Sequence, residues 1–375
     1  MSIWTPEAFL GASDSKIMIT RLSHYLRRSG FLEAQVAALL GAADTADFAS
    51  NSVLYALDSL ESTEILCAST TGLLVQLFIC NGEAPIKGYM RMLPGDLRRL
   101  LERLDLLEFN LETVSARASI TPCLSMYFLS DPLFNCFSRA EEQQELIMSE
   151  LAGFVMPPHA STFLLLDNIE DTRGRLIDVG CGSGVLSLGL RDRQDKVTGI
   201  DSNPRAIAYS RLNSLLNGKD VNFRLGDFRE GYDERGYFDQ LIFNGPTKST
   251  HKTCTRETGA LSAEEIVIGI AQSAATVLRP GGTAQVLVIV EVHESYDSAT
   301  DIIREWLRKR PEVRSFRVTE VPVSTLGIPS QAIMRGRLQP GCLLADDQED
   351  GNLLMEYLRE QGIREVMPAV VSMVM

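Results

Sequence analysis

Cysteine is scarce and scattered in this sequence. The chain has seven cysteines among 375 residues, an odd number with no CxxC pair. A disulfide framework or a cysteine-rich metal centre would need more regular spacing. We therefore expect reduced thiols, mostly packed as small apolar side chains. The four histidines also lack the spacing of metal ligands, so no metal site is predicted.

Long apolar runs and an excess of positive charge are missing as well. No run approaches the roughly 20 residues that cross a bilayer, and no basic segment followed by an apolar one suggests a signal peptide. The formal net charge of −13 disfavours binding of nucleic acid or of an anionic membrane as the main role. We expect a cytoplasmic globular protein, because 45% hydrophobic and 23% charged residues is an ordinary composition for one.

The N-terminal part is predicted to be mainly helical. Apolar residues recur at helical spacing over residues 17–41 and about 53–80, and a further helix begins near Pro94. Residues 114–120 alternate like a strand, with 125–129 as a possible partner.

Helices followed by a hairpin suggest that residues 1–137 form a winged-helix-like domain. Its expected role is that of a lid or a dimerisation domain, which would make a homodimer. DNA binding is the alternative, but the helix after Pro94 mixes Arg98, Arg99 and Arg103 with acidic residues.

Residues 138–375 are predicted to form an α/β domain. Strands alternating with helices form βαβ units and a parallel sheet. We therefore expect a mostly parallel, doubly wound, Rossmann-like sheet. The expected helices lie after residue 138, at 160–168 and at 352–361, and the expected strands at 175–179, 197–201, 221–225, 240–244 and 284–290.

The first chemical motif is a glycine-rich turn between an apolar strand and a helix. Gly180, Gly182 and Gly184 occupy alternate positions after Asp178, with Cys181 between the first two. Glycine tolerates positive φ and lets the backbone approach a ligand closely, and the following helix presents free N–H groups. The turn is a candidate ligand-binding loop because both flanking elements are present.

Polar residues follow the ends of the next three predicted strands. Asp201, with Ser202 after it, comes about 20 residues past the first glycine, where a carboxylate can accept hydrogen bonds from ribose hydroxyls. Asp227 can accept from an adenine amine while Phe228 packs against the ring. Asn244 ends the last of these strands, at the expected reaction site.

These four segments, in this order and spacing, resemble the class I S-adenosylmethionine-dependent methyltransferases. The resemblance covers residues 157–290 and is closest to the branch with an Asn-Pro-Pro-aromatic loop, which includes N-methyltransferases of the methyltransferase small-domain kind. It implies S-adenosylmethionine as the cofactor. The methionine part would lie beside Asp178 and loop residues 180–184, the ribose beside Asp201 and Ser202, and the adenine beside Asp227 and Phe228.

The sequence departs from that branch at the reaction site, where it has Asn244-Gly245-Pro246-Thr247. In the family the Asn side chain and the next carbonyl accept hydrogen bonds from the amine, and the aromatic residue covers it. Asn244, Gly245 and Pro246 are therefore the candidate catalytic residues, with Asn244 orienting an amine for attack. The missing aromatic disfavours a planar amide or nucleobase acceptor.

Two reactions fit such a site. The first is methyl transfer to a nitrogen or oxygen of a separate acceptor, expected to be a small molecule. The second is the cyclisation performed by the azetidine-2-carboxylate synthases, which resemble these methyltransferases. In that reaction the amine of S-adenosylmethionine attacks its own γ-carbon, which gives azetidine-2-carboxylate and methylthioadenosine. A small, closed, apolar pocket would favour the second reaction.

Other interpretations stay open. A nicotinamide dinucleotide also needs glycines and an acidic strand end, but the sequence DxGxGxG differs from GxGxxG. The fold could also bind nothing, or act as a cofactor-sensing regulator. His159 can line the pocket or simply pack, and the sequence selects no general base among Glu264, Glu265, Tyr127 and Tyr209.

Overall fold

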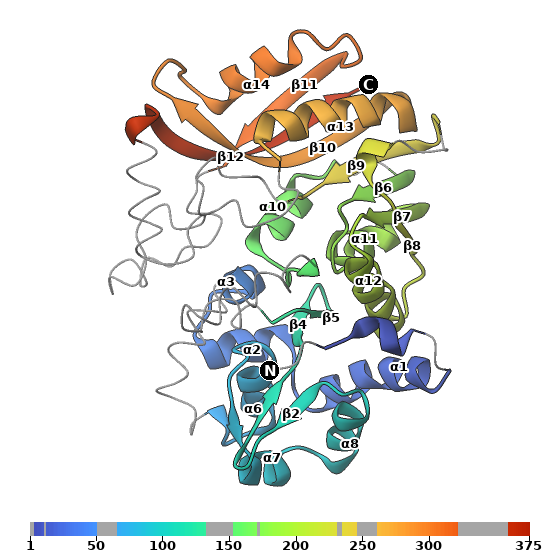
Figure 1. The fold of residues 1–375 in the computed structure, drawn as a ribbon, viewed down its shortest axis with the longest axis vertical. Coiled ribbons are helices and arrows are strands. Elements are labelled where there is room, and N and C mark those ends of the chain that lie inside the picture. The colour runs from blue at the N-terminus through green and yellow to red at the C-terminus, as the bar shows by residue number, and fades with distance from the viewer. Residues whose placement is uncertain are drawn as a thin grey trace. The chain divides into compact units, whose positions relative to one another are not determined.

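In the computed structural model the chain forms two compact units (Figure 1). The first comprises residues 1–160, 182–189 and 203–221, and the second residues 161–181, 190–202 and 222–375. These units interleave along the chain, unlike the domains 1–137 and 138–375, which stay a prediction. The structure describes residues 4–10, 13–50, 66–132, 153–170, 173–230, 235–245, 261–321 and 359–375.

Helices dominate the first unit, as predicted. The helical spacing over residues 17–41 corresponds to two helices, because Gly30, with a φ of 73°, and Gly41, with a φ of 67°, stand where helix ends are expected. Glycine adopts this left-handed conformation without strain. The helices of this unit are η1 (Pro6–Phe9), α1 (Ser13–Arg28), α2 (Glu33–Leu40), α3 (Thr45–Ser50), α6 (Thr70–Phe78), α7 (Ile86–Met92), α8 (Gly95–Arg103), α11 (Val185–Leu190) and α12 (Pro204–Asn217).

A three-stranded sheet completes a winged-helix-like module in this unit. Strands β1 (Ala84–Pro85), β2 (Leu107–Phe109) and β3 (Thr113–Ala116) pair in the order β1-β3-β2. The order along the chain is α6, β1, α7, α8, β2, β3. Helix α8 buries Leu97, Leu100 and Leu101 and exposes its charged residues, which is the amphipathic pattern read from the sequence.

A second hairpin follows, formed by β4 (Ser119–Cys123) and β5 (Met126–Ser130). The single strand expected over 114–120 is therefore two strands, β3 and β4, and only β4 pairs with the expected partner. The two turn residues Leu124 and Ser125 have φ angles of 53° and 59°. Positive φ at both central residues is typical of the type I′ turn, whose twist matches a two-residue hairpin.

The second unit is built on a seven-stranded sheet in the order β11-β12-β10-β9-β6-β7-β8. Only β12 runs antiparallel to its neighbours. All five strands predicted from the sequence are confirmed. The strands are β6 (Arg175–Val179), β7 (Lys196–Asp201), β8 (Asn222–Leu225), β9 (Phe238–Phe243), β10 (Leu278–His293), β11 (Ser315–Glu320) and β12 (Ile363–Val374).

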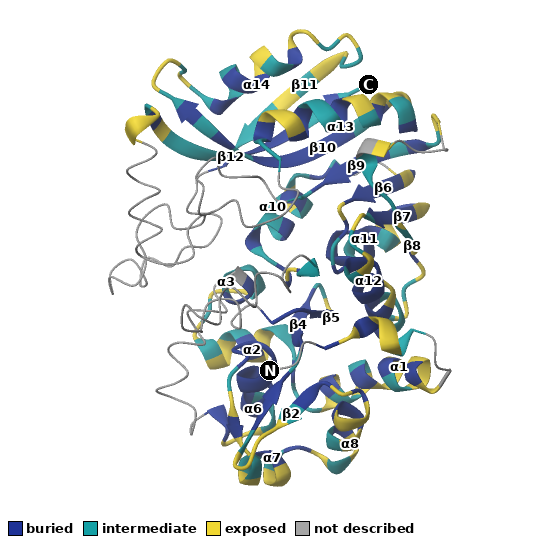
Figure 2. Cartoon of the chain, viewed as in Figure 1, coloured by how far each residue is buried: buried dark blue, intermediate teal, exposed yellow. Residues whose placement is uncertain are grey.

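Helices cover both faces of this sheet. On one face α13 packs against β9 and β10 through a buried apolar core (Figure 2). On the other face Gln285 of β10 donates to the Asn168 carbonyl at 2.7 Å, which holds the end of α10. The predicted mostly parallel, doubly wound α/β fold is confirmed. The helices are α10 (Ala160–Asn168), η4 (Arg191–Arg193), η5 (Phe228–Glu230), α13 (Ala263–Val277) and α14 (Ala299–Leu307).

Some predicted elements fall outside the described residues, namely the helix after residue 138 and most of the helix at 352–361. Within the part of the chain that the structure describes, no helix is long and apolar enough to cross a membrane.

Candidate functional site

The carboxyl ends of four parallel strands bring the predicted site residues to one edge of the sheet. Val179 of β6 lies opposite Ile200 of β7 and Phe243 of β9, and Asp201 lies opposite Leu225 of β8. The residues that follow these strand ends therefore share one edge. Strand order reverses between β6 and β9, which is where open α/β sheets bind their ligands.

The glycine-rich loop has the backbone conformation that its sequence predicts. Gly180, Gly182 and Gly184 have φ angles of 68°, 53° and 84°. A Cβ atom built on Gly182 would meet no atom within 4 Å, so space is open beside the loop. The Cys181 N–H donates to the Ile200 carbonyl at 3.0 Å, which ties the loop to β7. Asp178, just before the loop, is buried.

The two strand ends after the loop keep their carboxylates at the same edge. Asp201 and Asp227 are both partly exposed, and Ser202 is exposed. The Gly226 N–H donates to the Asp201 carbonyl at 2.9 Å, which joins the end of β8 to the end of β7. This bond fixes the spacing between the two carboxylate-bearing segments.

Phe228 packs within the protein on one side. Its ring lies edge-on to Phe243, with 5.8 Å between centroids and 60° between planes. A Cβ on Gly269 of α13 would lie 3.3 Å from the same ring. Phe228 is partly exposed, so its stacking on an adenine stays a prediction.

Asn244 follows β9 and is held by a partner that the sequence did not indicate. Its Nδ2 donates to the Ser161 Oγ at 3.3 Å. Ser161 lies in the first turn of α10, 83 positions earlier in the chain. This bond joins the end of β9 to the first turn of α10. Pro246 lies outside the described residues, so its predicted role stays a prediction.

The glycine at position 245 has a steric cause. A Cβ atom there would lie 2.2 Å from Cζ of Phe243 and 2.6 Å from Cε1 of the same ring. A proline or any larger residue would have to displace this ring, which also packs on Phe228. The position of the Phe243 ring therefore explains why glycine stands at position 245 in place of the proline of the Asn-Pro-Pro loop.

Three of the four candidate bases have structural roles. Tyr127 donates its hydroxyl to the Phe31 carbonyl at 2.8 Å, and Tyr209 donates to Asp131 at 2.8 Å. Burial raises the pKa of Tyr127 to about 12, and burial together with Asp131 raises the pKa of Tyr209 as well. Glu265 completes a capping box with Ser262 at the start of α13. A phenol with a raised pKa is not ionised near neutral pH, so neither tyrosine is suited to act as the general base.

His159 lies just before α10 and is neutral at physiological pH. Burial lowers the pKa of its imidazole to about 4. A neutral imidazole can accept or donate a single proton. The predicted place of His159 in the pocket stays a prediction.

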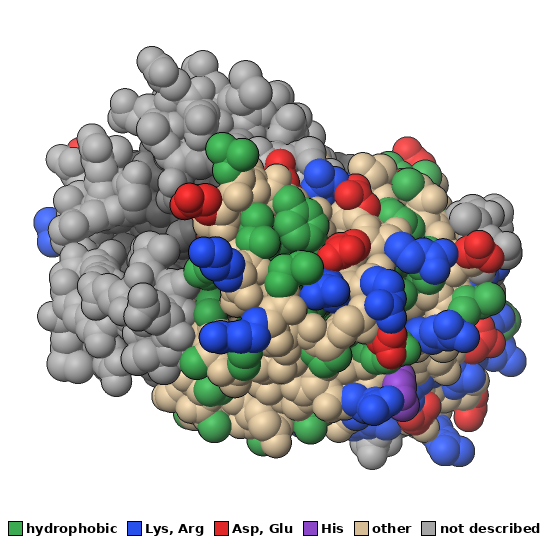
Figure 3. Space-filling model, turned by 90° about the horizontal axis from the view of Figure 1, so that it is seen from below, with side chains coloured by type: hydrophobic (Ala, Val, Ile, Leu, Met, Phe, Trp, Pro, Cys, Tyr) green, Lys and Arg blue, Asp and Glu red, His purple; other side chains and the backbone are tan. Residues whose placement is uncertain are grey.

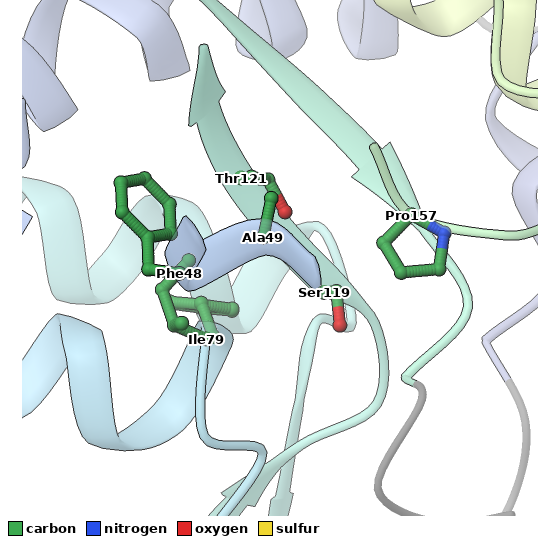
Figure 4. A pocket seen from close by; sticks show the side chains of 7 residues that line it. Phe48, Ala49, Ile79, Ser119, Thr121 and Pro157 are labelled. Carbon is green, nitrogen blue, oxygen red and sulfur yellow. The ribbon is translucent and has the colours of Figure 1, made fainter. Parts of the chain in front are cut away.

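A small cavity lies inside the first unit (Figure 4). Its volume of about 10 Å³ suits one water molecule at most. It cannot hold an acceptor substrate. The cavity is lined by Phe48, Ala49, Phe78, Ile79, Ser119, Thr121 and Pro157.

The described cysteines and acidic residues are not arranged as a metal centre. Cys67, Cys80, Cys123 and Cys181 are buried. Among the residues that the structure describes, no group of three or more His, Cys, Asp or Glu side chains is arranged to hold a metal ion.

Comparison with known proteins agrees with this geometry. The family model of the methyltransferase small domain matches residues 159–318, which contain the whole candidate site. Residues 159–318 are thus similar to the methyltransferase small domain, and this similarity supports the expected class I S-adenosylmethionine-dependent superfamily. Azetidine-2-carboxylate synthesis finds no support in the match and stays a prediction.

Individual relatives resemble the same part of the chain. A putative protein N5-glutamine methyltransferase of Methanocaldococcus jannaschii is 27% identical over 152 residues, 38% of this chain and 76% of the relative. The release factor glutamine methyltransferase of Deinococcus radiodurans is 32% identical over 135 residues, 34% of this chain and 48% of the relative. A ubiquinone biosynthesis O-methyltransferase of Bordetella parapertussis is 35% identical over 89 residues, 22% of this chain and 37% of the relative. The chain thus spans about half or less of the length of the last two.

Proposed function

We propose that this protein transfers a methyl group from S-adenosylmethionine to a nitrogen, or an oxygen, of a small-molecule acceptor. The observation that carries the proposal is the single edge at which the glycine-rich loop, Asp201, Asp227 and Asn244 meet. The relatives act on both nitrogen and oxygen by their names, so the acceptor atom is part of the proposal.

The residues present fit S-adenosylmethionine. The open space beside Gly182 leaves room for a ligand against the loop. Asp201 would accept hydrogen bonds from the ribose hydroxyls, and Asp227 from the adenine amine. S-Adenosylmethionine supplies an electrophilic methyl on a sulfonium, which is its own leaving group.

The chain's part in the reaction is to hold and orient the acceptor. Asn244 would accept a hydrogen bond from the acceptor amine through its Oδ1, since its Nδ2 is engaged by Ser161. Such an arrangement aims the amine lone pair and restricts its motion, which is the main source of rate acceleration for this kind of displacement. The amine proton is lost after transfer and needs no strong base.

Nucleic acid is a poor candidate for the acceptor. On the face that carries α7 and α8, Lys and Arg side chains are interspersed with Asp and Glu (Figure 3). Arg99 forms an ion pair with Asp96, and Nε of Arg98 lies 4.0 Å from Oε1 of Glu102. This surface supports neither DNA binding nor a cofactor-sensing regulator with a basic reading helix.

The nucleoside product tests the proposal. The purified full chain would be incubated with S-adenosylmethionine and a panel of small amines and phenols, and products followed by mass spectrometry. S-Adenosylhomocysteine formed in equal amount to a methylated acceptor is the expected result. Methylthioadenosine formed without any acceptor, well above its spontaneous rate, would instead mean cyclisation or another aminocarboxypropyl reaction and would overturn methyl transfer.

A further inference from the structure

Two asparagines of α12 close the open edge of the β4–β5 hairpin. The Leu129 N–H donates to Oδ1 of Asn213 at 2.8 Å, and Nδ2 of Asn213 donates to the Leu129 carbonyl at 2.9 Å. One helical turn later, Asn217 makes the same pair of bonds with Tyr127 at 2.9 and 2.7 Å. Each side-chain amide thus makes the two hydrogen bonds that a residue of a third strand would make with β5.

The two asparagines differ in one bond. Each Nδ2 carries two N–H groups, and in Asn217 the second one donates to the Asn213 carbonyl of its own helix at 2.9 Å. In Asn213 the second N–H donates to the Ser183 carbonyl at 2.8 Å. Asn213 is fully buried, so this bond has no competition from water.

Ser183 is the residue between the last two glycines of the glycine-rich loop. It lies between Gly182, with a φ of 53°, and Gly184, with a φ of 84°. Glycines on both sides leave the peptide between them free to rotate. A buried bond to the Ser183 carbonyl selects one orientation of that peptide and therefore one shape of the loop.

The hairpin also contacts the helix that follows this loop. A Cβ atom on Gly189 of α11 would lie 2.8 Å from Cδ1 of Leu124, the residue at the hairpin tip. Four hydrogen bonds of side-chain amides thus hold the hairpin to α12, and its turn packs on α11. Both helices adjoin segments that carry predicted cofactor residues.

We propose that Asn213 is a positioning residue that fixes the Ser183 peptide of the glycine-rich loop in the shape that binds S-adenosylmethionine. The inference rests on the proposed function for the identity of the ligand. The matched variants Asn213→Ala and Asn217→Ala test it, because both break the hairpin ladder and only the first removes the bond to the loop.

The experiment compares thermal stability, S-adenosylmethionine affinity by calorimetry, and amide hydrogen exchange of residues 180–189. Both variants are expected to lose stability. Only Asn213→Ala is expected to raise the dissociation constant, by roughly tenfold, since a buried carbonyl without a donor favours other loop shapes. Only that variant is expected to speed exchange in the loop.

Equal effects of the two variants on affinity and exchange, or no effect of either, would overturn the inference. If Asn213→Ala does not fold, Asn213→Ser and Asn217→Ser repeat the comparison, because serine keeps a small polar side chain without adding a charge but loses both amide N–H groups. Hydrogen exchange needs no ligand. Failure of the wild-type chain to bind S-adenosylmethionine would therefore overturn the proposed function without deciding the role of Asn213.

Discussion

At the scale of single residues, Gly245 offers a sharp steric test. Gly245→Ala is expected to push the Phe243 ring and disturb its packing on Phe228, because the new Cβ would lie 2.2 Å from Cζ of that ring. Overpacking of this kind costs about 1–3 kcal/mol, measured as a lower free energy of unfolding. S-Adenosylmethionine affinity should fall with it.

The control for that variant is Gly88→Ala in α7. A Cβ on Gly88 would meet no atom within 4 Å, so alanine should leave stability unchanged or raise it. If Gly245→Ala were as stable as Gly88→Ala and bound the cofactor as well, Phe243 would not be the reason for glycine at position 245.

His159 predicts a dependence of stability on pH. Its pKa is about 4 in the folded protein and 6.5 for the unperturbed group, so the unfolded chain binds more protons between these values. Above pH 6.5 the ring is neutral in both states and the free energy of unfolding is at its full value. As the pH falls from 6.5 toward 4, protonation of the unfolded chain lowers the free energy of unfolding. His159→Gln should lose less thermal stability than the wild type between pH 7 and about 4.5. Parallel melting curves for the two proteins would contradict a depressed pKa.

Residues that follow a strand were predictable from the sequence, while their partners were not. Asp201, Asp227 and Asn244 stand at the ends of apolar runs, and the rule that parallel strands share a carboxyl edge brings them together. Ser161 and Asn213 act through contacts with distant segments, and no local spacing marks them. The steric role of Phe243 likewise depends on where its ring lies in the folded chain, which the sequence does not indicate.

At the scale of elements, the start of α12 is held by a buried carboxylate. Asp131, after β5, accepts from Nε of Arg205 at 3.1 Å, from the Tyr209 hydroxyl at 2.8 Å and from the Val155 N–H at 2.9 Å. The side chain of Asp131 is only 5% exposed. The network joins α12, β5 and the segment that leads to α10.

Asp131→Ala is expected to destabilise the protein by about 3 kcal/mol or more, because it leaves a largely buried guanidinium without its partner. Chemical unfolding measures this change. The control is Glu170→Ala, which removes an exposed ion pair with Arg317 at 2.8 Å and should cost under about 1 kcal/mol. Similar losses for both variants would mean that Asp131 contributes no more than a surface charge.

Elements with strong periodicity were predicted well, and short adjacent strands were not. Helix α10 and strand β6 have the predicted bounds, since an apolar run with clear ends defines each. Residues 114–120 alternate without a break, yet the chain changes partner between β3 and β4. Which strand pairs with which is a tertiary choice that alternation alone does not encode.

At the scale of the whole molecule, the strand order of the seven-stranded sheet and the residues at its carboxyl edge support the proposed methyltransferase function. The N-terminal part has a winged-helix-like topology, and its mixed surface charge argues against a nucleic-acid reader. The expected homodimer stays a prediction, which sedimentation of the purified chain would test. The net charge of −13 agrees with a small-molecule acceptor better than with a polyanion.

The central claim is that the sheet edge formed by β6, β7, β8 and β9 binds S-adenosylmethionine, and calorimetric titration of the purified full chain tests it most directly. We expect one ligand per chain and a loss of affinity of roughly a hundredfold in Asp201→Ala, as two charge-assisted hydrogen bonds to ribose would be lost. The exposed Asp195, at the other end of β7, provides the control Asp195→Ala, which should bind as the wild type does. No binding by the wild-type chain, or equal binding by Asp201→Ala, would contradict the account.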